Sequence, residues 1–540
     1  MILLNIYFDK YSKHTVRDFA NGTAHKLEKE LVIQLLPQKH QKVFVSKAFS
    51  SNFKNSCASH AYSILLTLEH FLLRFIPAKN AYNWALFEQI DFALLEELLD
   101  ISEINIYLTT KGNQRNITKA RTLTLAIEDD RLNPAWAGLE VIHEHPSTIV
   151  SMSMRDSNLV LLQKLSGRFP TMNSVTKNII FMSGVALQMS FELIKNYTET
   201  KVVNPQQKEV TANFFYREFP QLTVSNILRY SSWQFIRIVS TKLARARKVK
   251  VSPRWQIAFA MRSWDDLCDA EIQVVSNPEG RSLADPFVVT WDEQTVIFVE
   301  DIELQSGKGS ISVIDFDSTG GTNITPCIQE KFHLSFPFTF EFQGELYMCP
   351  ESSNSNSIRI YKCREFPHGW DFVREIISGI EAVDTIIFPS NGLWWMLTGI
   401  SNLGYFGRMS ELHCFYSTNP LSTEWLPHDP EIVVRDSLCG RNGGYFLDPS
   451  GMIRVGQTFG FQSYGKGLSM SRLTNISENT YEERKIVDFL VNKDSVLTGL
   501  HHLTSSRKLS AFDILAPNDL HGKTTFEKLG IAVAFPDVVN

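Results

Sequence analysis

Cysteine is scarce in this sequence, with seven residues among 540 and no Cys-x-x-Cys pair. A small, odd number of thiols without that spacing argues against a disulfide framework and against a cysteine zinc site. A surplus of basic residues is also lacking, because the formal net charge is −5, and this argues against nucleic acid as the main partner. We therefore expect a cytoplasmic protein with reduced cysteines, no nucleic-acid partner and no metal site.

Long uncharged apolar runs are missing as well. No stretch of about 18 such residues occurs, so the sequence predicts no transmembrane helix. The nearest candidate, residues 178–194, is interrupted by Gln188 and Glu192 and is more typical of a buried helix. Residues 1–9 are too short in apolar length and lack a basic lead, so they predict a buried strand rather than a signal peptide.

The first 200 residues alternate between strand and helix patterns. Apolar runs predict strands at residues 3–7, 104–108, 123–127, 147–154 and 159–165. Apolar residues at helical spacing predict helices over residues 61–75 and 174–197. We therefore expect an α/β domain over residues 1–200.

Residues 201–253 read as a linker whose central part, residues 227–243, is predicted to be helical. A basic run without an intervening acid follows, made of Lys242, Arg245, Arg247, Lys248, Lys250 and Arg254. Such a run is more often a solvated connector than a site, but it can bind anionic phosphates or an acidic membrane surface. Peripheral contact with a membrane through this linker is therefore the alternative to a plain spacer.

Five short polar motifs recur after residue 254, each at the start of a β-rich segment. They are Ala284-Asp285-Pro286-Phe287, His333-Leu334-Ser335-Phe336-Pro337, Ala382-Val383-Asp384-Thr385, Gly440-Arg441-Asn442-Gly443-Gly444 and Gly499-Leu500-His501-His502. With Asp285, Ser335, Asp384, Asn442 and His502 as anchors, the steps are 50, 49, 58 and 60 residues. Even units of several short strands are typical of propeller blades, so residues 254–515 predict an all-β, five-bladed β-propeller.

The anchors open the innermost strand of each blade, so their side chains should meet at the central axis. A strand over residues 255–261 precedes the first anchor and is well placed to pair with the last blade. Propellers that close in this way leave no long exposed sheet edge. Residues 516–540 show no clear pattern and are expected to be a C-terminal tail.

These motifs, taken in order, resemble the β-propeller domain of the glucosamine inositolphosphorylceramide transferase family. Further matching pieces are Met348-Cys349-Pro350-Glu351, Arg454-Val455-Gly456-Gln457, Tyr464-Gly465 and His501-His502-Leu503. That propeller is similar to those of glycoside hydrolase families 43, 62, 32 and 68. The resemblance implies carbohydrate chemistry at the axis. In the plant members a glycosyltransferase domain lies beyond the propeller, and we expect none in this chain.

Sugar chemistry at such an axis needs carboxylates. The resemblance makes Asp285 the expected general base, with Asp384 and Glu351 as acid or supporting groups. The alternative for Asp285 and Asp384 is an ordinary acid at a turn or strand end, and Glu351 could instead only bind sugar hydroxyls. The related hydrolases use three acids from successive blades, whereas the second anchor here is Ser335, which favours transfer or plain binding over hydrolysis.

Other motif residues are expected to bind the substrate. They are His333, Ser335, Arg441, Asn442, Arg454, Gln457, His501 and His502. Arg441 suits the phosphate of a nucleotide-sugar donor because a guanidinium binds phosphate bidentately, and the glycines beside it suit a close approach to a ligand. Neighbours on a strand point to opposite sides, so at most one of His501 and His502 should reach the axis.

The leading hypothesis is a glycosyltransferase of bacterial surface polysaccharide or glycolipid assembly. Its partners would be a nucleotide sugar as co-substrate and a glycan or lipid-linked acceptor, and no cofactor is certain. Two alternatives stay open. One is a non-catalytic sugar-binding module, and the other is a family-43-like glycoside hydrolase.

The first domain resembles the formyltransferase-like domain that precedes a propeller in some bacterial proteins. The matching stretches are residues 82–87 and 121–165. Ala126 and Ile127 stand where that family tends to have histidines, while Asp129 and Asp156 stand near its acids. Without an imidazole the general base is missing, so a degenerate domain is expected.

Overall fold

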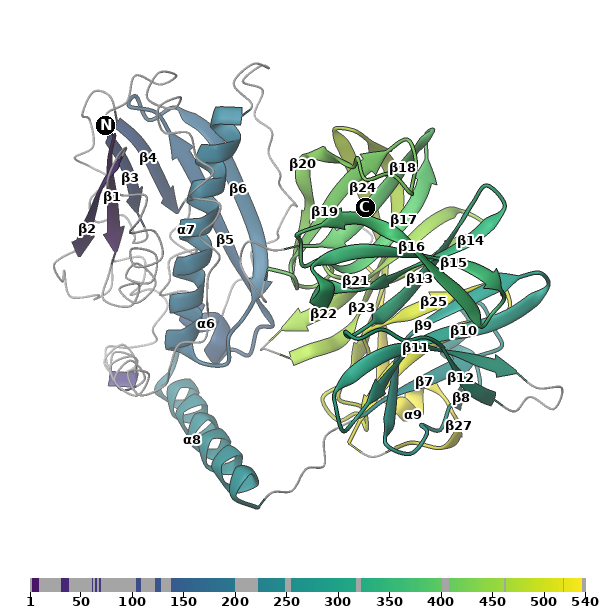
Figure 1. Cartoon of the computed structure of the whole chain (residues 1–540). Coiled ribbons are helices and arrows are strands. Elements are labelled where there is room, and N and C mark those ends of the chain that lie inside the picture. Colours follow the sequence, from purple (N-terminus) through teal and green to yellow (C-terminus); the bar gives the residue numbers. More distant parts are fainter. Residues whose placement is uncertain are drawn as a thin grey trace. The chain divides into compact units, whose positions relative to one another are not determined.

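The computed structural model describes two compact units of the chain. In the first unit the described residues are 2–8, 31–37, 61, 64, 65, 68, 103–107, 122–127, 137–199 and 222–247. In the second they are 254–316, 322–400, 407–459, 463–517 and 519–536. Figure 1 labels their helices and strands, and we describe each unit by itself.

The first unit contains a six-stranded sheet in the order β2-β1-β3-β4-β5-β6. The strands are β1 (Ile2–Phe8), β2 (Leu31–Pro37), β3 (Glu103–Tyr107), β4 (Thr122–Ile127), β5 (Ser147–Arg155) and β6 (Leu161–Pro170). The first four strands run parallel, whereas β5 and β6 form an antiparallel hairpin at one edge. The strands predicted from apolar runs are therefore present, and the formyltransferase-like character stays a prediction.

The helices whose bounds lie within the described part of this unit are α6 (Ala137–Ile142), α7 (Val175–Glu199) and α8 (Val224–Arg247). Helix α7 is buried nearly all round, as predicted for its largely apolar central part, and the polar Asn178, Ser183, Gln188 and Ser190 are buried with it. The buried side chain of Asn178 accepts the backbone N–H of Met172 at 2.9 Å and so joins the first turn of the helix to the residues before it. Among the described residues, no helix is long and apolar enough to cross a membrane.

Of the two acids predicted in the first unit, Asp156 lies among the described residues. Asp156 accepts the N–H groups of Asn158 and Val160 and so shapes the turn between β5 and β6. Asp129 lies outside the described residues, and so do the side chains of the basic run before Arg254. Of the helix predicted over residues 61–75, only a few helical positions are described.

The second unit is built from five antiparallel sheets. The first sheet contains β9 (Arg281–Trp291), β10 (Gln294–Glu303), β11 (Lys308–Phe316) and β12 (Thr322–Ile328). The second contains β13 (Ser335–Phe342), β14 (Glu345–Glu351), β15 (Ser357–Glu365) and β16 (Gly369–Ser378). The third contains β17 (Val383–Ser390), β18 (Leu393–Gly399), β19 (Glu411–Ser417) and β20 (Leu426–Arg435). The fourth contains β21 (Asn442–Asp448), β22 (Gly451–Gly460), β23 (Ser463–Ser477) and β24 (Thr480–Val491). The fifth contains β25 (Leu503–Ser505), β26 (Ser510–Ala516), β7 (Arg254–Ala260) and β8 (Ile272–Val274).

The innermost strands of these sheets form a closed ring. Strand β9 contacts β13, β13 contacts β17, β17 contacts β21, β21 contacts β25, and β25 returns to β9. Five sheets arranged around such a ring are a five-bladed β-propeller, as the spacing of the motifs predicts.

The ring is closed by strands from both ends of the unit. Strand β7 pairs with β26 from Ala260–Ser510 to Arg254–Ala516, which confirms the predicted closure. The segment expected as a tail is part of the propeller: β27 (Gly522–Thr524) pairs with β8, and β28 (Ile531–Ala534) pairs with β24. The short helix α9 (Phe526–Leu529) joins these two strands.

A two-residue bulge recurs where each of the first four inner strands begins. The pairing register shifts after Ala284, Ser335, Val383 and Asn442. In the first three blades the next residue has a positive φ, at 51° for Asp285, 45° for Phe336 and 51° for Asp384. The second-blade equivalent of the two aspartates is therefore Phe336 and not Ser335, which lies one residue earlier.

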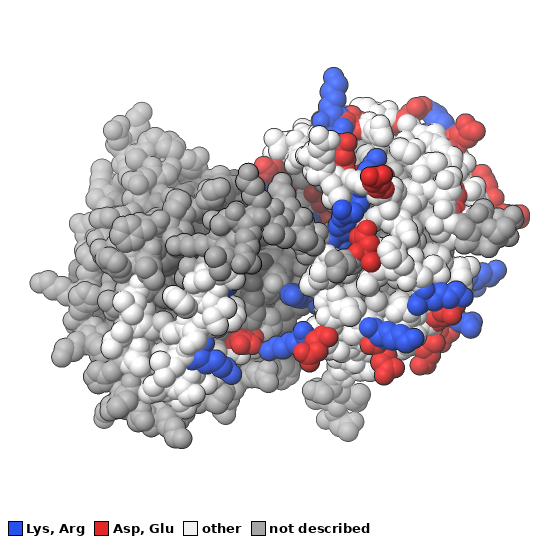
Figure 2. Space-filling model, turned by 90° about the horizontal axis from the view of Figure 1, so that it is seen from below, with Lys and Arg blue, Asp and Glu red and all other residues white. Residues whose placement is uncertain are grey.

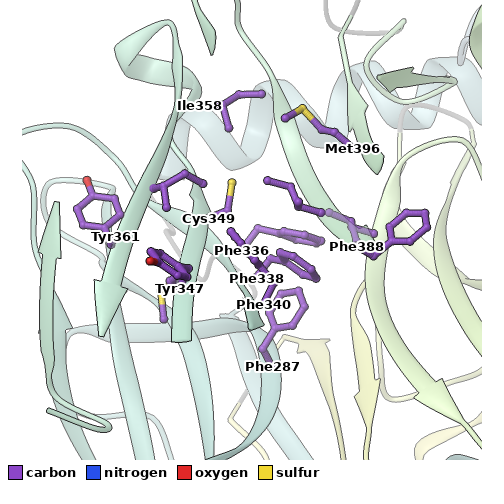
Figure 3. Close-up of a cluster of buried hydrophobic side chains, with 14 of the residues drawn as sticks. Phe287, Phe336, Phe338, Phe340, Tyr347, Cys349, Ile358, Tyr361, Phe388 and Met396 are labelled. Carbon is purple, nitrogen blue, oxygen red and sulfur yellow. The ribbon is translucent and has the colours of Figure 1, made fainter. Parts of the chain in front are cut away.

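Aromatic side chains pack beside these bulges. Phe287 of blade one and Phe336, Phe338 and Phe340 of blade two lie close together in the cluster that Figure 3 shows. Phe340 also contacts Trp394 of blade three, so the cluster is shared among blades. The rings of Phe287 and Phe336 are 4.9 Å apart and meet edge to face. This cluster is buried, so it fixes the backbone that carries the axial side chains. On the propeller face in Figure 2, Lys and Arg are interspersed with Asp and Glu, and the described part of that face has no single-sign patch.

The glycines of the fourth motif make room for a neighbouring strand. A Cβ on Gly443 would lie 2.5 Å from the carbonyl oxygen of His501, and one on Gly444 would lie 2.0 Å from that of Leu503. These glycines therefore allow the backbone of the fifth blade to pack closely. The sequence had suggested that they make room for a ligand.

Gly444→Ala is expected to destabilise the propeller by at least about 2 kcal/mol more than Gly451→Ala. Both glycines have a strongly positive φ, at 136° and 125°, but nothing lies within 4 Å of a Cβ at Gly451. Gly451→Ala therefore measures the cost of backbone strain alone, and the additional loss in Gly444→Ala measures the clash with the carbonyl of Leu503. Urea denaturation of both variants measures the difference, and equal losses would show that the contact with Leu503 is not tight.

Candidate functional site

The ring brings the three predicted carboxylates to the axis from three blades. Asp285 and Asp384 occupy equivalent bulges in blades one and three. Glu351 ends β14 in blade two, and its Oε2 accepts the backbone N–H of Asp384 at 3.3 Å. Asp285 and Asp384 are almost fully buried, and the side chain of Glu351 is largely buried. Groups far apart in the sequence therefore form one charged cluster.

Asp285 is held by several hydrogen-bonding groups at once. Its Oδ1 lies 3.2 Å from Nε2 of His501 and 3.4 Å from Nδ1 of His502, and its Oδ2 accepts the N–H of Phe336 at 3.1 Å. Burial alone would raise the pKa of Asp285, but the hydrogen bonds and charges of the two histidines outweigh it and hold that pKa well below its usual range. Asp285 is therefore ionised at neutral pH.

Both histidines of the fifth motif reach the axis, so the expectation that only one does is wrong. They precede β25, which begins at Leu503, and the alternation of a regular strand does not apply to them. Neither ring nitrogen of His502 has a hydrogen-bond partner with good geometry among the described residues, although the ring is fully buried, and Nδ1 approaches Asp285 at 3.4 Å. That ring packs edge to face on Phe287 and Phe336 at 4.6 and 5.1 Å.

Asp513 anchors both histidines, and sequence reasoning missed it as a site residue. Its Oδ1 accepts the backbone N–H groups of His501 and His502, each at 3.0 Å. Its Oδ2 lies 2.7 Å from Nδ1 of His501 and accepts the N–H of Asp285 at 3.1 Å. The side chain is fully buried in β26. The one sequence signal was an acid placed inside an apolar strand, Ser510-Ala511-Phe512-Asp513-Ile514.

His501 lies between two buried carboxylates. Burial would lower the pKa of its imidazole, but Asp513 and Asp285 raise it to about 10. His501 therefore carries a proton on each nitrogen at neutral pH. Its ligand atoms and those of Asp285 and Asp513 are close enough to hold a metal ion. Both imidazole nitrogens face carboxylates, so without a metal ion the three side chains form an ion-pair triad.

A second acid–histidine pair, Glu300 and His333, joins the first two blades. Nε2 of His333 lies 2.9 Å from Oε1 of Glu300, and its Nδ1 accepts the N–H of Gly309 at 2.9 Å. Burial raises the pKa of Glu300 to about 6, while the hydrogen bond from His333 opposes this shift. His333 was predicted to bind substrate; Glu300, which pairs across from Ala284, was missed because nothing in its strand marks it.

Asp384 forms the other half of the site. Its Oδ2 lies 2.5 Å from Nε of Arg441 and also accepts a hydrogen bond from the Nε2 amide of Gln457 at 3.0 Å. Burial raises the pKa of Asp384 to about 8 against the opposing charge of Arg441, and the carboxylates of Glu351 and Asp285 act in the same direction as burial. The pKa values of Asp384 and Asp285 are thus shifted in opposite directions.

Arg441 and Tyr464 connect the two halves. Among the described residues, the contacts of the terminal nitrogens of Arg441 are long, at 3.5 Å to the sulfur of Met409 and 3.7 Å to Glu351. Its guanidinium lies 5.3 Å from the ring centre of Tyr464, whose ring is 4.9 Å from that of His501. Arg441 therefore keeps donor groups that a ligand anion could use.

Two predicted ligand-binding residues are used within the fold. Arg454 is fully buried and makes a bidentate pair with Glu483 at 2.5 and 2.8 Å, with a further bond to the carbonyl of Cys439. The amide of Asn442 donates to the carbonyls of Asp384 and Leu397. Both residues stabilise blade four and its junction with blade three, and we remove them from the ligand-contacting set.

Ser335 and Gln457 take intermediate positions. Ser335 is buried and paired in register with Glu351, one residue before the axial bulge. Gln457 donates to Asp384 and to the carbonyl of Asn442, while its buried Oε1 has no partner among the described residues. The side-chain amide of Gln457 thus has an acceptor left for a ligand.

The ring of blades and its buried acids, histidines and arginine define a β-propeller with a polar, ionisable axis. Residues 255–507 match the family model "Glucosamine inositolphosphorylceramide transferase 1, N-terminal". The transferase of that name from Arabidopsis thaliana is 33% identical over 211 residues, 38% of this chain. Its namesake from Oryza sativa subsp. japonica is 28% identical over 206 residues, 37% of this chain. The chain spans about a quarter of these relatives, 27% of each.

Solved structures give a weaker likeness. The GH43_1 enzyme from Xanthomonas citri, in complex with xylotriose, is 11% identical, with a TM-score of 0.30 over 43% of this chain and 88% of that one. The fold assignment rests on the sheet order of this chain instead. The named relatives are plant transferases, so the expectation of a bacterial pathway has no support from them.

Proposed function

We propose that the propeller axis is a carbohydrate-active site that transfers a glycosyl group from a nucleotide sugar to a lipid-linked or glycan acceptor. The observation that supports it best is the convergence of ionisable side chains from all five blades, namely Asp285, Glu351, Asp384, Arg441 and His501. Burial of charge is costly, so a purely structural axis would be expected to be apolar. The match to a transferase family supports the same class of chemistry.

The two axial aspartates suit different roles. Asp285 is ionised and can stabilise the positive charge that develops on a sugar ring during transfer. Asp384, with a pKa raised to about 8, holds a proton at neutral pH and can act as an acid. The sequence suggested Asp285 as the general base, but a carboxylate with so low a pKa is a weak base.

His502 is better placed to accept a proton. Among the described residues neither ring nitrogen has a hydrogen bond, and Nδ1 is the one that faces Asp285, at 3.4 Å. A hydrogen bond from Nδ1 to Asp285 in the ligand-bound state would leave the lone pair on Nε2. A carboxylate that sets the tautomer of an imidazole in this way is a common arrangement for a general base. In this scheme Arg441 binds the donor phosphate through its terminal nitrogens.

A non-catalytic sugar-binding module is the second candidate, and one observation favours it. Phe336 occupies the second-blade position that matches Asp285 and Asp384, so the axis lacks an acid there. Blade two instead supplies Glu351 from its second strand, which departs from the acid pattern expected of a family-43-like hydrolase, so a hydrolase ranks below both transfer and binding.

The test is a thermal-shift panel of nucleotide sugars, free nucleotides and oligosaccharides. A ligand at a hundred times its Kd stabilises the folded state by about 2.7 kcal/mol, which gives a clear rise in Tm. Stabilisation by one nucleotide sugar, followed by turnover with an acceptor, supports transfer. Stabilisation by oligosaccharides alone supports the binding module, and no stabilisation by any compound contradicts both.

Arg441→Lys is expected to weaken nucleotide-sugar binding by about tenfold or more. Lysine keeps the charge but cannot hold Asp384 and a phosphate at the same time with a planar fork. Calorimetric titration measures the Kd. Arg472→Lys is the matched control, because Arg472 forms a comparable ion pair with Asp448 away from the axis. An unchanged Kd in Arg441→Lys would rule out the phosphate contact.

A further inference from the structure

Helix α8 of the first unit has its apolar side turned to solvent. Its buried positions include the polar residues Gln234 and Tyr230, which hydrogen-bond each other at 2.6 Å. Gln234 also donates to the carbonyl of Asn173, so this side of the helix is fastened to the chain before α7. The helix is therefore held by contacts that are partly polar, with the buried Ile227 beside them, while several other large apolar side chains lie on the opposite side.

The exposed apolar residues form one continuous stripe. They are Leu228, Phe235, Ile236 and Val239, and Phe235 and Ile236 are 69% and 64% exposed. Phe235, Ile236 and Val239 come seven, eight and eleven residues after Leu228, and such separations place side chains on one side of an α-helix. Trp233, also exposed, lies beside this stripe with the guanidinium of Arg237 at 5.2 Å from its ring. Large apolar side chains gathered in this way mark an interaction surface.

The charge of α8 indicates what this surface binds. The 24 residues of the helix include five basic residues, Arg229, Arg237, Lys242, Arg245 and Arg247, and no acid. The exposed Arg229 lies next to the apolar stripe. Docking of a second copy would bring two purely basic helices together and would be opposed by repulsion. An anionic, partly apolar surface fits both features.

We propose that α8 binds the surface of a bilayer that contains anionic lipids. Leu228, Phe235, Ile236 and Val239 would enter the boundary between head groups and acyl chains, and the exposed Arg229 beside them would face the lipid phosphates. The helix lies in the plane of the surface, since no described helix is apolar enough to cross. The inference does not depend on the proposed chemistry, although a membrane-bound chain would reach a lipid-linked acceptor.

The test is flotation of the full chain with vesicles of phosphatidylcholine, alone or with about 30% phosphatidylserine. Wild type is expected to bind the anionic vesicles and to be released by high salt. The double variant Phe235→Ser, Ile236→Ser is expected to lose about tenfold or more in partition coefficient, since each buried CH₂ contributes about 0.8 kcal/mol. Arg229→Glu should weaken binding without removing apolar surface.

The matched control is the double variant Leu426→Ser, Leu447→Ser, which removes two exposed leucines from the propeller. It should bind as wild type does. Equal loss in this control, absence of binding to anionic vesicles, or equal binding to neutral vesicles would overturn the proposal. So would a dimer in lipid-free sedimentation that dissociates on Phe235→Ser, Ile236→Ser, because the stripe would then be a contact between two copies.

Discussion

Asp513→Asn is expected to lower the free energy of unfolding of the propeller by about 3–5 kcal/mol. Each carboxylate oxygen of Asp513 faces two nitrogen groups, which are two backbone N–H groups on one side and His501 with the N–H of Asp285 on the other. An asparagine must turn its NH₂ group toward one of these pairs. It would also leave the buried imidazolium with one counter-charge fewer. Urea denaturation followed by tryptophan fluorescence measures the loss.

Asp371→Asn is the matched control for this substitution. Asp371 pairs with Arg364 at 2.9 Å, but both side chains are largely exposed. A surface ion pair of this kind contributes about 0–1 kcal/mol. If the two variants lost similar stability, Asp513 would not hold the axis in the way that its contacts indicate.

The pH dependence of stability gives Asp513→Asn a second readout. The pKa of His501 is raised to about 10 in the folded protein from 6.5, so its contribution is complete below 6.5 and is lost as pH rises to 10. Asp513 is a main cause of that shift. The decline in stability over this window should therefore be shallower in Asp513→Asn than in wild type, and an unchanged slope would contradict the triad.

Much of the propeller could be predicted from the sequence because its signals are local. Turn residues and alternating apolar residues mark each strand, and the even spacing of the motifs marks the blades. The pairing of β7 with β26 follows from the need to close a ring. The strands after residue 516 could not be predicted in this way. Strands β27 and β28 are three and four residues long, and such short strands form only because open sheet edges are present beside them.

The site was predicted in part, since Asp285, Asp384 and Arg441 do meet at the axis. The partners Asp513 and Glu300 lie inside strands of ordinary β pattern, and only the closed ring brings them to the cluster. The assignment of Ser335 failed by one residue because the bulge, which inserts an extra position, cannot be read from alternation. Arg454 was misjudged because its motif position says nothing about Glu483, which comes from another strand.

Asp285→Asn is expected to lower the rate of glycosyl transfer by about 10²–10⁴-fold. The amide keeps the shape of the side chain but removes the negative charge that faces the sugar. It also weakens the hold on His501 and on the tautomer of His502, both of which contact Oδ1. Turnover of the nucleotide sugar found in the ligand panel measures the effect. Asp448→Asn, which removes a carboxylate paired with Arg472 away from the axis, should leave turnover unchanged.

The pH profile of turnover separates a catalytic role from simple binding. Because burial raises the pKa of Asp384 to about 8, its acid form is lost as pH rises through 8, and the wild-type rate should fall there. Asp384→Asn cannot lose that proton, so its lower rate should no longer fall near pH 8. Asp285→Asn should keep the falling limb, shifted to lower pH, because one carboxylate that raises the pKa of Asp384 is gone. A sugar-binding module would instead show unchanged affinity in Asp285→Asn and no turnover at any pH.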